Sequence, residues 1–444
     1  MPDMMSGQRW RSSHVFILVT CGLAIFTDVF FYGLLPPILP SILRDRLHVQ
    51  ADKVQLWTSL LPAIYSIASV VSSPLAGYYS DAIGRRKPLF MAALVSQFAG
   101  ISLITAGNSL ALWIAGLIVT GLSSGVVWTS SLAIAIDATA QENLSEKLGF
   151  VNISLSCGLF LGTVLGGVVY YSGGYYSVWA MCYALLVIDA ILRLLLIEPR
   201  DSKSSPPTTD GPDNPIVTNP EDRSSQPDSL KGALAPALVL WTSPRFTAMI
   251  VVTILDATLL TSFDGALAIH LGEIFSYNTL QVGLTYMALV APVFLGPLVG
   301  RRADRSGARV VLSTTLFLSI VPLVCLRFVD HDGTSQKALI CILLFLVGLL
   351  SAGRLGIYSA EVDRAVTSYS RKRPDSVDRE KGLAQAQGVW TAAYSTGCAL
   401  GPIFGGLILG HAGWSTETWA VAVLSAAAGT IVVIMASGQP RSTD

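Results

Sequence analysis

Four charged residues lie inside long apolar stretches of the sequence, where an ionised side chain is costly: Asp28, Asp256, Asp264 and Arg354. At the centre of a membrane-spanning helix such a charge costs about 2.5–3.5 kcal/mol, so it should face the protein interior and have a use. Asp28 lies twelve residues before Pro40, about 18 Å along a helix, and therefore near the middle of a span. We expect Asp28 to carry a proton or to bind a cation; a structural hydrogen bond is the alternative.

The other charges leave more than one interpretation open. Asp256 and Asp264 are eight residues apart on the same broad helix face, and Asp264, in the outer half, is either a functional acid or a hydrated acid at a cavity mouth. Arg354 either holds a substrate carboxylate or balances an acid elsewhere. Asp189 and Arg193 are spaced i,i+4 and predict a structural ion pair.

The elements that position these residues follow from composition and hydropathy. The chain has 444 residues, of which 52% are hydrophobic and 13% are charged, against about 25% charged in soluble domains. A membrane-spanning helix needs about 20 mostly apolar residues. Such stretches are centred in 15–40, 57–79, 88–107, 110–136, 148–171, 176–197, 244–270, 280–299, 309–329, 338–359, 385–410 and 416–436. The sequence therefore predicts an all-α membrane protein with twelve transmembrane helices.

The predicted spans divide the chain into two bundles of six helices. We expect a tail over 1–13, an N-terminal bundle over 14–197, a flexible loop over 198–243, a C-terminal bundle over 244–436 and a second tail over 437–444. Of the 29 basic residues, five fall on one side and two inside spans, which leaves 22 on the side of the termini. Because cytosolic loops carry the excess of Lys and Arg, both termini are predicted to be cytosolic.

The two predicted bundles share repeated motifs. Gly, Asp and Gly recur at equal spacing after the second and eighth spans, and a glycine ladder recurs in the fifth and eleventh spans at a constant offset of 239 residues. The loop motifs are Gly77, Asp81, Gly84 and Gly300, Asp304, Gly307; the ladders are Gly158, Gly162, Gly166, Gly167 and Gly397, Gly401, Gly405, Gly406, with Pro402 in the second. Such a duplication is typical of secondary transporters.

The loop motifs combine acidic with basic residues. Basic residues alone would be enough to fix the orientation of the chain in the membrane, so the acids indicate a further role. We expect the acids to pair with basic residues and to hold the inner faces of the two bundles together in one state of a gating cycle; the alternative is that the bases only fix topology. The acids are Asp81, Asp137, Asp304, Glu361 and Asp363, and the bases are Arg85, Arg86 and Arg309. Five aromatic residues are candidates to line a central cavity, with packing as the alternative: Tyr32, Trp128, Tyr286, Trp390 and Tyr394.

These motifs resemble those of the major facilitator superfamily over essentially the whole chain. The segment from Gly77 to Lys87 is similar to the family's signature loop between helices 2 and 3, and the span 5 ladder resembles the helix 5 motif of drug:proton antiporters, with Thr163 where a proline is usual. The segment from Phe26 to Pro40 is similar to helix 1 of vesicular amine transporters and their fungal relatives, which carry an aspartate where Asp28 stands.

The chain also departs from these groups. The arginine of antiporter helix 4 should fall near Leu117, and further acids of amine transporters near Ala352 and Thr391, but none is present at those positions. The resemblance implies a secondary active transporter that exports a small amphipathic organic molecule by proton antiport, through rocker-switch alternating access. A proton-coupled importer or uniporter of a nutrient or organic anion, and a non-transporting receptor, are the alternatives.

The sequence predicts no enzyme, cofactor or metal site. It holds no G-x-S-x-G, P-loop or HExxH motif, and its six cysteines form no CxxC pair. A formal net charge of zero does not favour nucleic-acid binding. We expect a monomer whose partners are its small-molecule substrate, protons and the lipid bilayer, in the plasma membrane or else a vacuolar or vesicular membrane.

Overall fold

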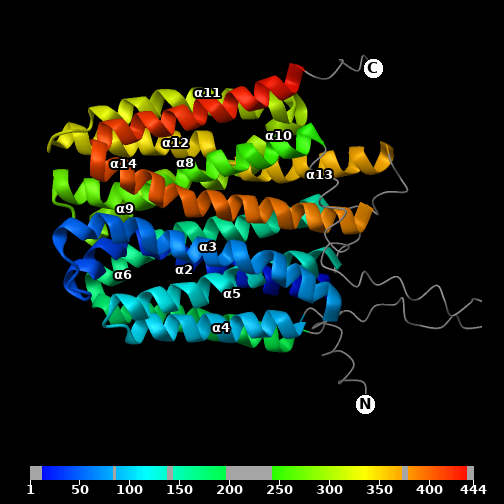
Figure 1. Ribbon diagram of the computed structural model, residues 1–444, viewed down its shortest axis with the longest axis horizontal. Coiled ribbons are helices and arrows are strands. Elements are labelled where there is room, and N and C mark those ends of the chain that lie inside the picture. Colours follow the sequence, from blue (N-terminus) through cyan, green and yellow to red (C-terminus); the bar gives the residue numbers. More distant parts are fainter. Residues whose placement is uncertain (1–12, 84–86, 138–143, 197–242, 373–378, 438–444) are drawn as a thin grey trace, which may run out of the picture.

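The computed structural model describes residues 13–83, 87–137, 144–196, 243–372 and 379–437, and these residues are helical apart from short connections (Figure 1). The predicted loop 198–243 falls almost entirely outside the described residues, as do both predicted tails but for their innermost residues. Within the described part of the chain, the predicted all-α class is confirmed.

The first part of the chain, 13–196, forms five helices, of which the last bends at Gly174. They are α2 (His14–Asp45), α3 (Ala51–Ile83), α4 (Lys87–Ala106), α5 (Leu110–Asp137) and α6 (Leu144–Leu195). The first of these starts at an N-cap, where the Ser13 side chain accepts a hydrogen bond from the Phe16 backbone N–H. We call this part the N-terminal half.

The C-terminal half, 243–437, contains more interruptions. Its elements are α8 (Pro244–Phe275), α9 (Thr279–Val290), the 3-10 turn η4 (Ala291–Leu295), α10 (Gly296–Ser306), α11 (Ala308–Cys325), the 3-10 turn η5 (Leu326–Phe328), α12 (Thr334–Ser351), α13 (Arg354–Lys372) and α14 (Arg379–Ser437). Two predicted spans are interrupted here. The stretch 280–299 contains η4, and 338–359 is divided at Ala352 and Gly353, where Gly353 has a φ of 79° that favours glycine.

Nine helices in the described residues are long and apolar enough to cross a membrane, with a shorter apolar segment over Thr279–Leu295. The predicted twelve exceed this number by three: α6 and α14 each contain two predicted spans, and the predicted span 280–299 corresponds to the shorter segment. Gly174 interrupts α6 with a φ of 73°, and Gly413 interrupts α14 with a φ of 79°. Figure 1 shows the orange and red parts of α14 running in opposite directions, and α2 starting at the end of the molecule where α14 finishes.

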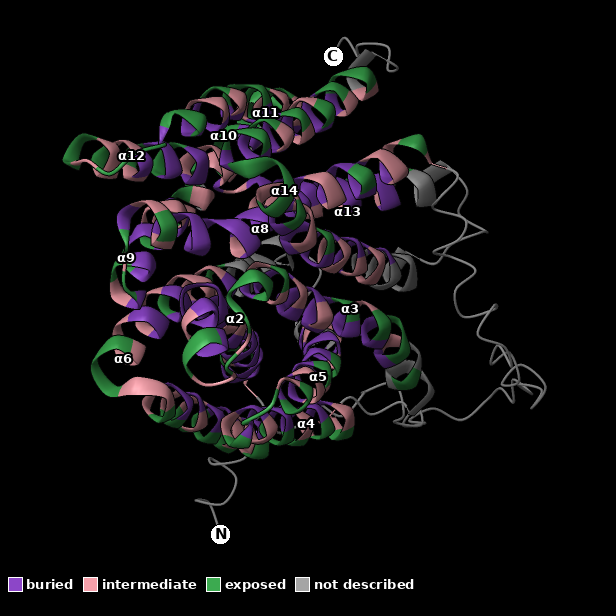
Figure 2. Cartoon of the chain, turned by 60° about the vertical axis from the view of Figure 1, so that its left-hand side comes forward, coloured by how far each residue is buried: buried purple, intermediate pink, exposed green. Residues whose placement is uncertain are grey.

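Burial identifies α2 and α8 as the central helices. In each of them 67% of the most apolar window is buried, against 33–56% in the other candidate spans. Outward-facing side chains on the surrounding helices are often large and apolar, such as Val95 on α4, Leu194 on α6 and Val321 on α11. Figure 2 shows exposed residues on the outer faces of α4 and α6 and buried residues along α2. An apolar exterior of this extent suits a surface covered by lipid.

The glycine ladders bring α6 against α2 and α14 against α8. A Cβ added at Gly158 or Gly162 would lie 2.7 Å and 2.4 Å from the carbonyl oxygens of Phe26 and Phe30. In the second copy, a Cβ at Gly405 would lie 2.3 Å from the Ser262 carbonyl oxygen. The repeat seen in the sequence is thus matched by equivalent backbone contacts, which small residues allow in membrane helices.

The last glycine of each ladder faces the other half. An added Cβ at Gly167 would lie 2.7 Å from the Thr279 carbonyl oxygen on α9, and one at Gly406 would meet the Ser59 side chain on α3. These contacts lie where α6 packs on α9 and α14 packs on α3. The two halves therefore meet through small residues as well.

Gly162→Ala should destabilise the protein by about 1–3 kcal/mol, because the added methyl group overpacks the contact with the Phe30 backbone. Gly272→Ala on α8 is the matched control: nothing lies within 4 Å of its added Cβ, and alanine favours a helix by about 1 kcal/mol over glycine. Thermal unfolding of the two purified variants measures the difference, and equal melting temperatures would contradict the packing account.

Candidate transport site

A cavity of about 1570 Å³ lies between the two halves and opens toward the end of the molecule where α2 starts. Its deep part is lined by residues of α2, α3, α5, α8, α9 and α14, and its mouth by Val15, Arg301, Arg364 and Ser368. Several polar side chains face an otherwise apolar wall, a composition suited to small organic ligands.

Asp28 is the acid most completely enclosed in the cavity wall, with 1% of its surface exposed. Its carboxylate accepts hydrogen bonds from the Ser124 hydroxyl at 2.7 Å, the Tyr65 hydroxyl at 3.0 Å and the Trp128 indole N–H at 3.1 Å. Among the described residues, no salt bridge reaches it. Neutral donors thus satisfy this acid, and its charge is not balanced by a base.

Asp264 lies on the same cavity but on the C-terminal half. Its carboxylate accepts a hydrogen bond from the Tyr32 hydroxyl of α2 at 3.0 Å, so this contact joins the two halves. The Tyr32 and Tyr65 rings lie 5.4 Å apart, and Tyr65 donates to Asp28. The two acids are therefore connected through a pair of tyrosines.

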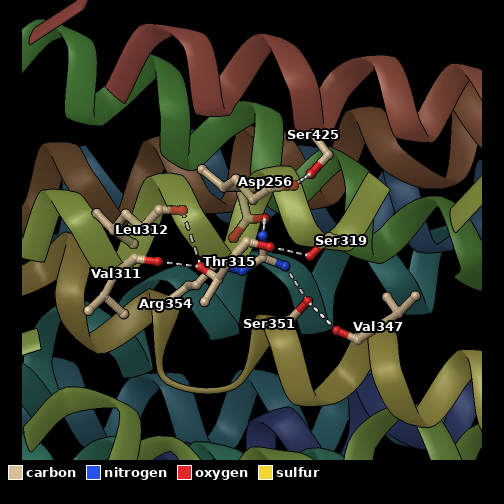
Figure 3. A network of polar contacts seen from close by, with 10 residues as sticks. Asp256, Val311, Leu312, Thr315, Ser319, Val347, Ser351, Arg354 and Ser425 are labelled. Atoms are coloured by element: carbon tan, nitrogen blue, oxygen red, sulfur yellow. Dashed lines mark hydrogen bonds and ion pairs between the residues drawn. The ribbon is translucent and has the colours of Figure 1, made fainter. Parts of the chain in front are cut away.

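Asp256 and Arg354 pair with each other, and neither of them lines the cavity. A nitrogen of the Arg354 guanidinium lies 3.0 Å from a carboxylate oxygen of Asp256, and both residues are buried. Figure 3 shows the pair beside Ser319 and Ser351, and Arg354 also donates to the Ser351 hydroxyl. Of the two interpretations of Arg354, the structure places it as the balance of an acid.

The expectation that Asp256 and Asp264 share one face needs correction. Asp256 points toward α13 and Asp264 toward α2. Two side chains eight positions apart on a helix point in directions that differ by about 80°. This angle is enough to place one on the cavity wall and the other in the core of one half. Asp189 and Arg193 form the predicted pair at 2.6 Å, both fully buried.

The end of the cavity opposite its mouth is closed by polar contacts between the halves. The Gln55 amide of α3 donates to the Gly265 carbonyl oxygen at 2.8 Å, and the Ser41 and Thr279 hydroxyls lie 3.2 Å apart. Together with the bond from Tyr32 to Asp264, these contacts gather on α8 and the start of α9.

The predicted gating residues lie at the open end, as far as the structure describes them. Glu361 on α13 pairs with Arg245 at 2.5 Å and Arg364 at 2.7 Å, which are both in the C-terminal half. Asp363 lines the cavity mouth, and Arg309 lies in the first turn of α11. Gly307 joins α10 to α11 with a φ of 90°, Gly300 lines the cavity, and Gly77 lies near the end of α3.

The remaining gating predictions fall outside the described residues. Gly84, Arg85 and Arg86 lie in an undescribed segment, and the side chains of Asp81, Asp137 and Asp304 are not described. Whether these acids and bases form a network between the halves therefore stays a prediction.

Four of the five predicted cavity aromatics line the cavity: Tyr32, Trp128, Tyr286 and Tyr394. Trp390 does not, which corrects its assignment. It is 7% exposed, belongs to the apolar core of the C-terminal half and lies 6.4 Å, ring to ring, from Tyr394. Trp390 therefore packs against Tyr394 from the core of the C-terminal half.

Sequence reasoning missed three polar residues of this region. Tyr65 and Ser124 hold Asp28, and the only signal was their polarity within otherwise apolar spans. Glu417 stood at the edge of a predicted span, 416–436, and was not singled out. The structure buries it completely, because α14 turns at Gly413 and resumes before this residue.

Known proteins similar to this chain are transporters. An uncharacterized MFS-type transporter of Schizosaccharomyces pombe is 29% identical over 90% of both chains. The MFS-type transporter ppzB of Metarhizium rileyi is 28% identical over 93% of both chains. The tetracycline resistance protein, class H, of Pasteurella multocida is 23% identical over 88% of this chain and 89% of its own.

Solved structures show the same fold at low sequence identity. The human organic anion transporter MFSD10 superposes with a TM-score of 0.67 at 16% identity, over 94% of this chain and 99% of its own. A bacterial homologue of the human lysosomal transporter Spinster, in an inward-facing and unoccupied conformation, superposes with a TM-score of 0.64 at 12% identity. The match covers 96% of this chain and 95% of the homologue.

A family model supplies the assignment. The model described as Major Facilitator Superfamily matches residues 21–353 and 249–443, which together cover nearly the whole chain. This match confirms the resemblance found in the sequence motifs: the chain is a multi-pass membrane protein and belongs to the Major Facilitator Superfamily of transporters.

Proposed function

We propose that this transporter exports a small amphipathic organic molecule and is driven by protons that enter in exchange. The observation that carries the proposal is Asp28, a buried acid on the cavity wall that is held by three neutral donors and no base. Such a group can gain or lose a proton without breaking an ion pair. The names of the tetracycline resistance relatives support export.

We propose further that the chain crosses the membrane twelve times, as two six-helix bundles over 14–197 and 244–436. The bends at Gly174 and Gly413 support this count, because each separates two apolar segments that the sequence treats as different spans. The equivalent glycine contacts in the two halves support a rocking motion of one bundle against the other. Both termini would be cytosolic, so the cavity in this state would open to the cytosol.

In this mechanism the bond between Tyr32 and Asp264 holds the outer end closed while Asp264 is ionised. A substrate that binds Asp264 from the cavity, or a proton, competes with Tyr32 for the carboxylate and releases the contact. An empty, unprotonated transporter would then stay closed on the outside, which prevents a futile leak. We expect plasma membrane as the location, with a vacuolar or vesicular membrane second, and a monomer.

Import of an organic anion has less support. The sequence favoured it through Arg354, but that guanidinium pairs with Asp256 and does not line the cavity. The deep part of the cavity wall instead presents acids and aromatic rings, which suits neutral or cationic amphipathic molecules, and its arginines lie at the mouth.

Cells that express the protein should accumulate less of an exported compound than cells without it. Labelled tetracycline is the first probe, within a panel of amphipathic compounds, because relatives carry the name of that resistance. Steady-state accumulation with and without a protonophore measures direction and coupling. Higher accumulation of any compound in the expressing cells would instead indicate import.

Asp28→Asn should reduce proton-driven transport to the level of cells that lack the protein, because an amide side chain does not gain or lose a proton near neutral pH. Folding should survive, since the neighbouring hydroxyls can reorient to pair with the amide, at a cost of about 1 kcal/mol. Asp28→Glu should restore part of the transport. Asp52→Asn, at an exposed acid early in α3, is the matched control, and full proton-driven transport in Asp28→Asn would exclude this acid.

Tyr32→Phe should open the outer end more often, because a hydrogen bond to a charged group contributes about 1.5–3 kcal/mol. A Ser41→Cys reporter at the outer contact should then react faster with an impermeant maleimide on whole cells. Tyr183→Phe is the control, because its hydroxyl bonds Ser102 within one half at 3.0 Å. Equal labelling in the two variants would show that Tyr32 does not hold the halves together.

A further inference from the structure

Glu417 is a completely buried acid that does not line the cavity. It lies on α14 just after the turn at Gly413. Trp414 and Val421, one turn to either side of it, belong to the same apolar core as Phe263 and Tyr286. Residues three and four apart share one helix face, so Glu417 points into the core of the C-terminal half and away from lipid.

Neither carboxylate oxygen of Glu417 has a hydrogen-bond partner. Within the described parts of the chain no basic side chain forms a salt bridge with it, whereas Asp189, Asp256 and Glu361 have arginines and Asp28 has neutral donors. An ionised carboxylate without partners is too costly in an apolar interior and takes up a proton instead. The position of Glu417 therefore requires the neutral acid in this state.

The surroundings connect Glu417 to both ends of the transport path. On the cavity side, Tyr286 lies near enough for the charges of both Asp264 and Glu417 to act on it, and its hydroxyl donates to the Phe263 carbonyl oxygen at 2.7 Å. On the outer side, the His270 ring stacks on Trp414 at 3.9 Å, and its Nε2 has no partner.

Other titratable groups on the elements packed against α14 leave this acid unbalanced. At the outer end, four of them are exposed: Arg327 on η5, Glu273 on α8, and Asp52 and Lys53 on α3. Cys325 on α11 is partly buried, and Lys337 on α12 pairs with Asp332 at 2.8 Å. Asp264, His270 and Tyr286 are among the titratable groups that lie inward of them, and none of the three is a hydrogen-bond partner of Glu417.

We propose that Glu417 is a second proton-binding site, separate from Asp28, which holds a proton while the outer end is closed and exchanges it with water when the outer end opens. Its role in coupling rests on the proposed proton exchange, but its occupancy by a proton in this state does not. The site would give the C-terminal half a proton of its own.

Infrared difference spectroscopy of the purified protein tests occupancy without any substrate. The spectrum of wild type minus Glu417→Gln at neutral pH should contain the C=O band of a neutral carboxyl group. Glu273→Gln, at an exposed acid on α8, is the control, and the spectrum of wild type minus this variant should lack that band. Glu417→Gln should melt no lower than wild type, because the amide resembles the neutral acid. Absence of the band, or a sodium-dependent loss of it, would overturn the proposal, since each indicates an ionised Glu417.

Exchange is tested by transfer to D2O, which shifts the same band. In a Ser41→Cys/Thr279→Cys variant, a disulfide at the outer contact should slow the shift at least tenfold, and a reductant should restore it. Oxidised single-cysteine variants are the controls. Equal exchange rates with and without the disulfide would show that the proton does not pass through the outer end, whatever the outcome of the transport assays.

Discussion

A charge inside a membrane helix must find its partner within the protein, because the hydrocarbon around it offers none. Apart from Glu417, this constraint separates two kinds of buried acid inside the spans. Asp189 and Asp256 each lie beside an arginine, inside the core of one half. Asp28 and Asp264 lie on the cavity wall and are held by hydroxyl and indole donors. The charge of the first kind is balanced by a base, whereas in the proposed mechanism acids of the second kind change theirs.

The acids can lie on the cavity wall only because α2 and α8 are the central helices. The glycine ladders decide this, since they let α6 and α14 approach the backbones of α2 and α8 closely enough to cover them. In the N-terminal ladder Thr163 stands where the C-terminal ladder has Pro402. The Thr163 hydroxyl donates back to the Leu159 carbonyl oxygen at 2.8 Å, whereas Pro402 has no backbone N–H to donate, and both helices continue through these positions. The two halves share a packing scheme while differing in local backbone chemistry.

Periodicity and hydropathy predicted the helical class and the Asp189–Arg193 pair from sequence, because each depends on residues close together in the chain. The repeat was visible because the glycine spacings are identical in its two copies. The partners of Asp28 could not be predicted, since Tyr65 and Ser124 reach it from two other helices. Trp390 and Tyr394 differ only by one helical turn, yet one lies in the core and the other on the cavity. Helix rotation decides such cases, and it is set by packing between helices and not by the local sequence.

The closed end of the cavity differs from the cores of the halves in a way that suits reversible opening. Within each half, large apolar clusters hold the helices together. At the closed end, among the described residues, only Ile269 and Leu409 of the C-terminal half join the cluster of the other half, beside small residues and a few neutral-donor hydrogen bonds around Asp264 and Gly265. An arginine at the position of Tyr32 would form a buried ion pair, and removing one partner from such a pair costs about 3–5 kcal/mol. Loss of the single hydrogen bond from a tyrosine hydroxyl costs less free energy when its acceptor binds a proton or a substrate instead. In the proposed cycle, the weakness of this contact is therefore what allows the chemistry of the cavity to move the two halves.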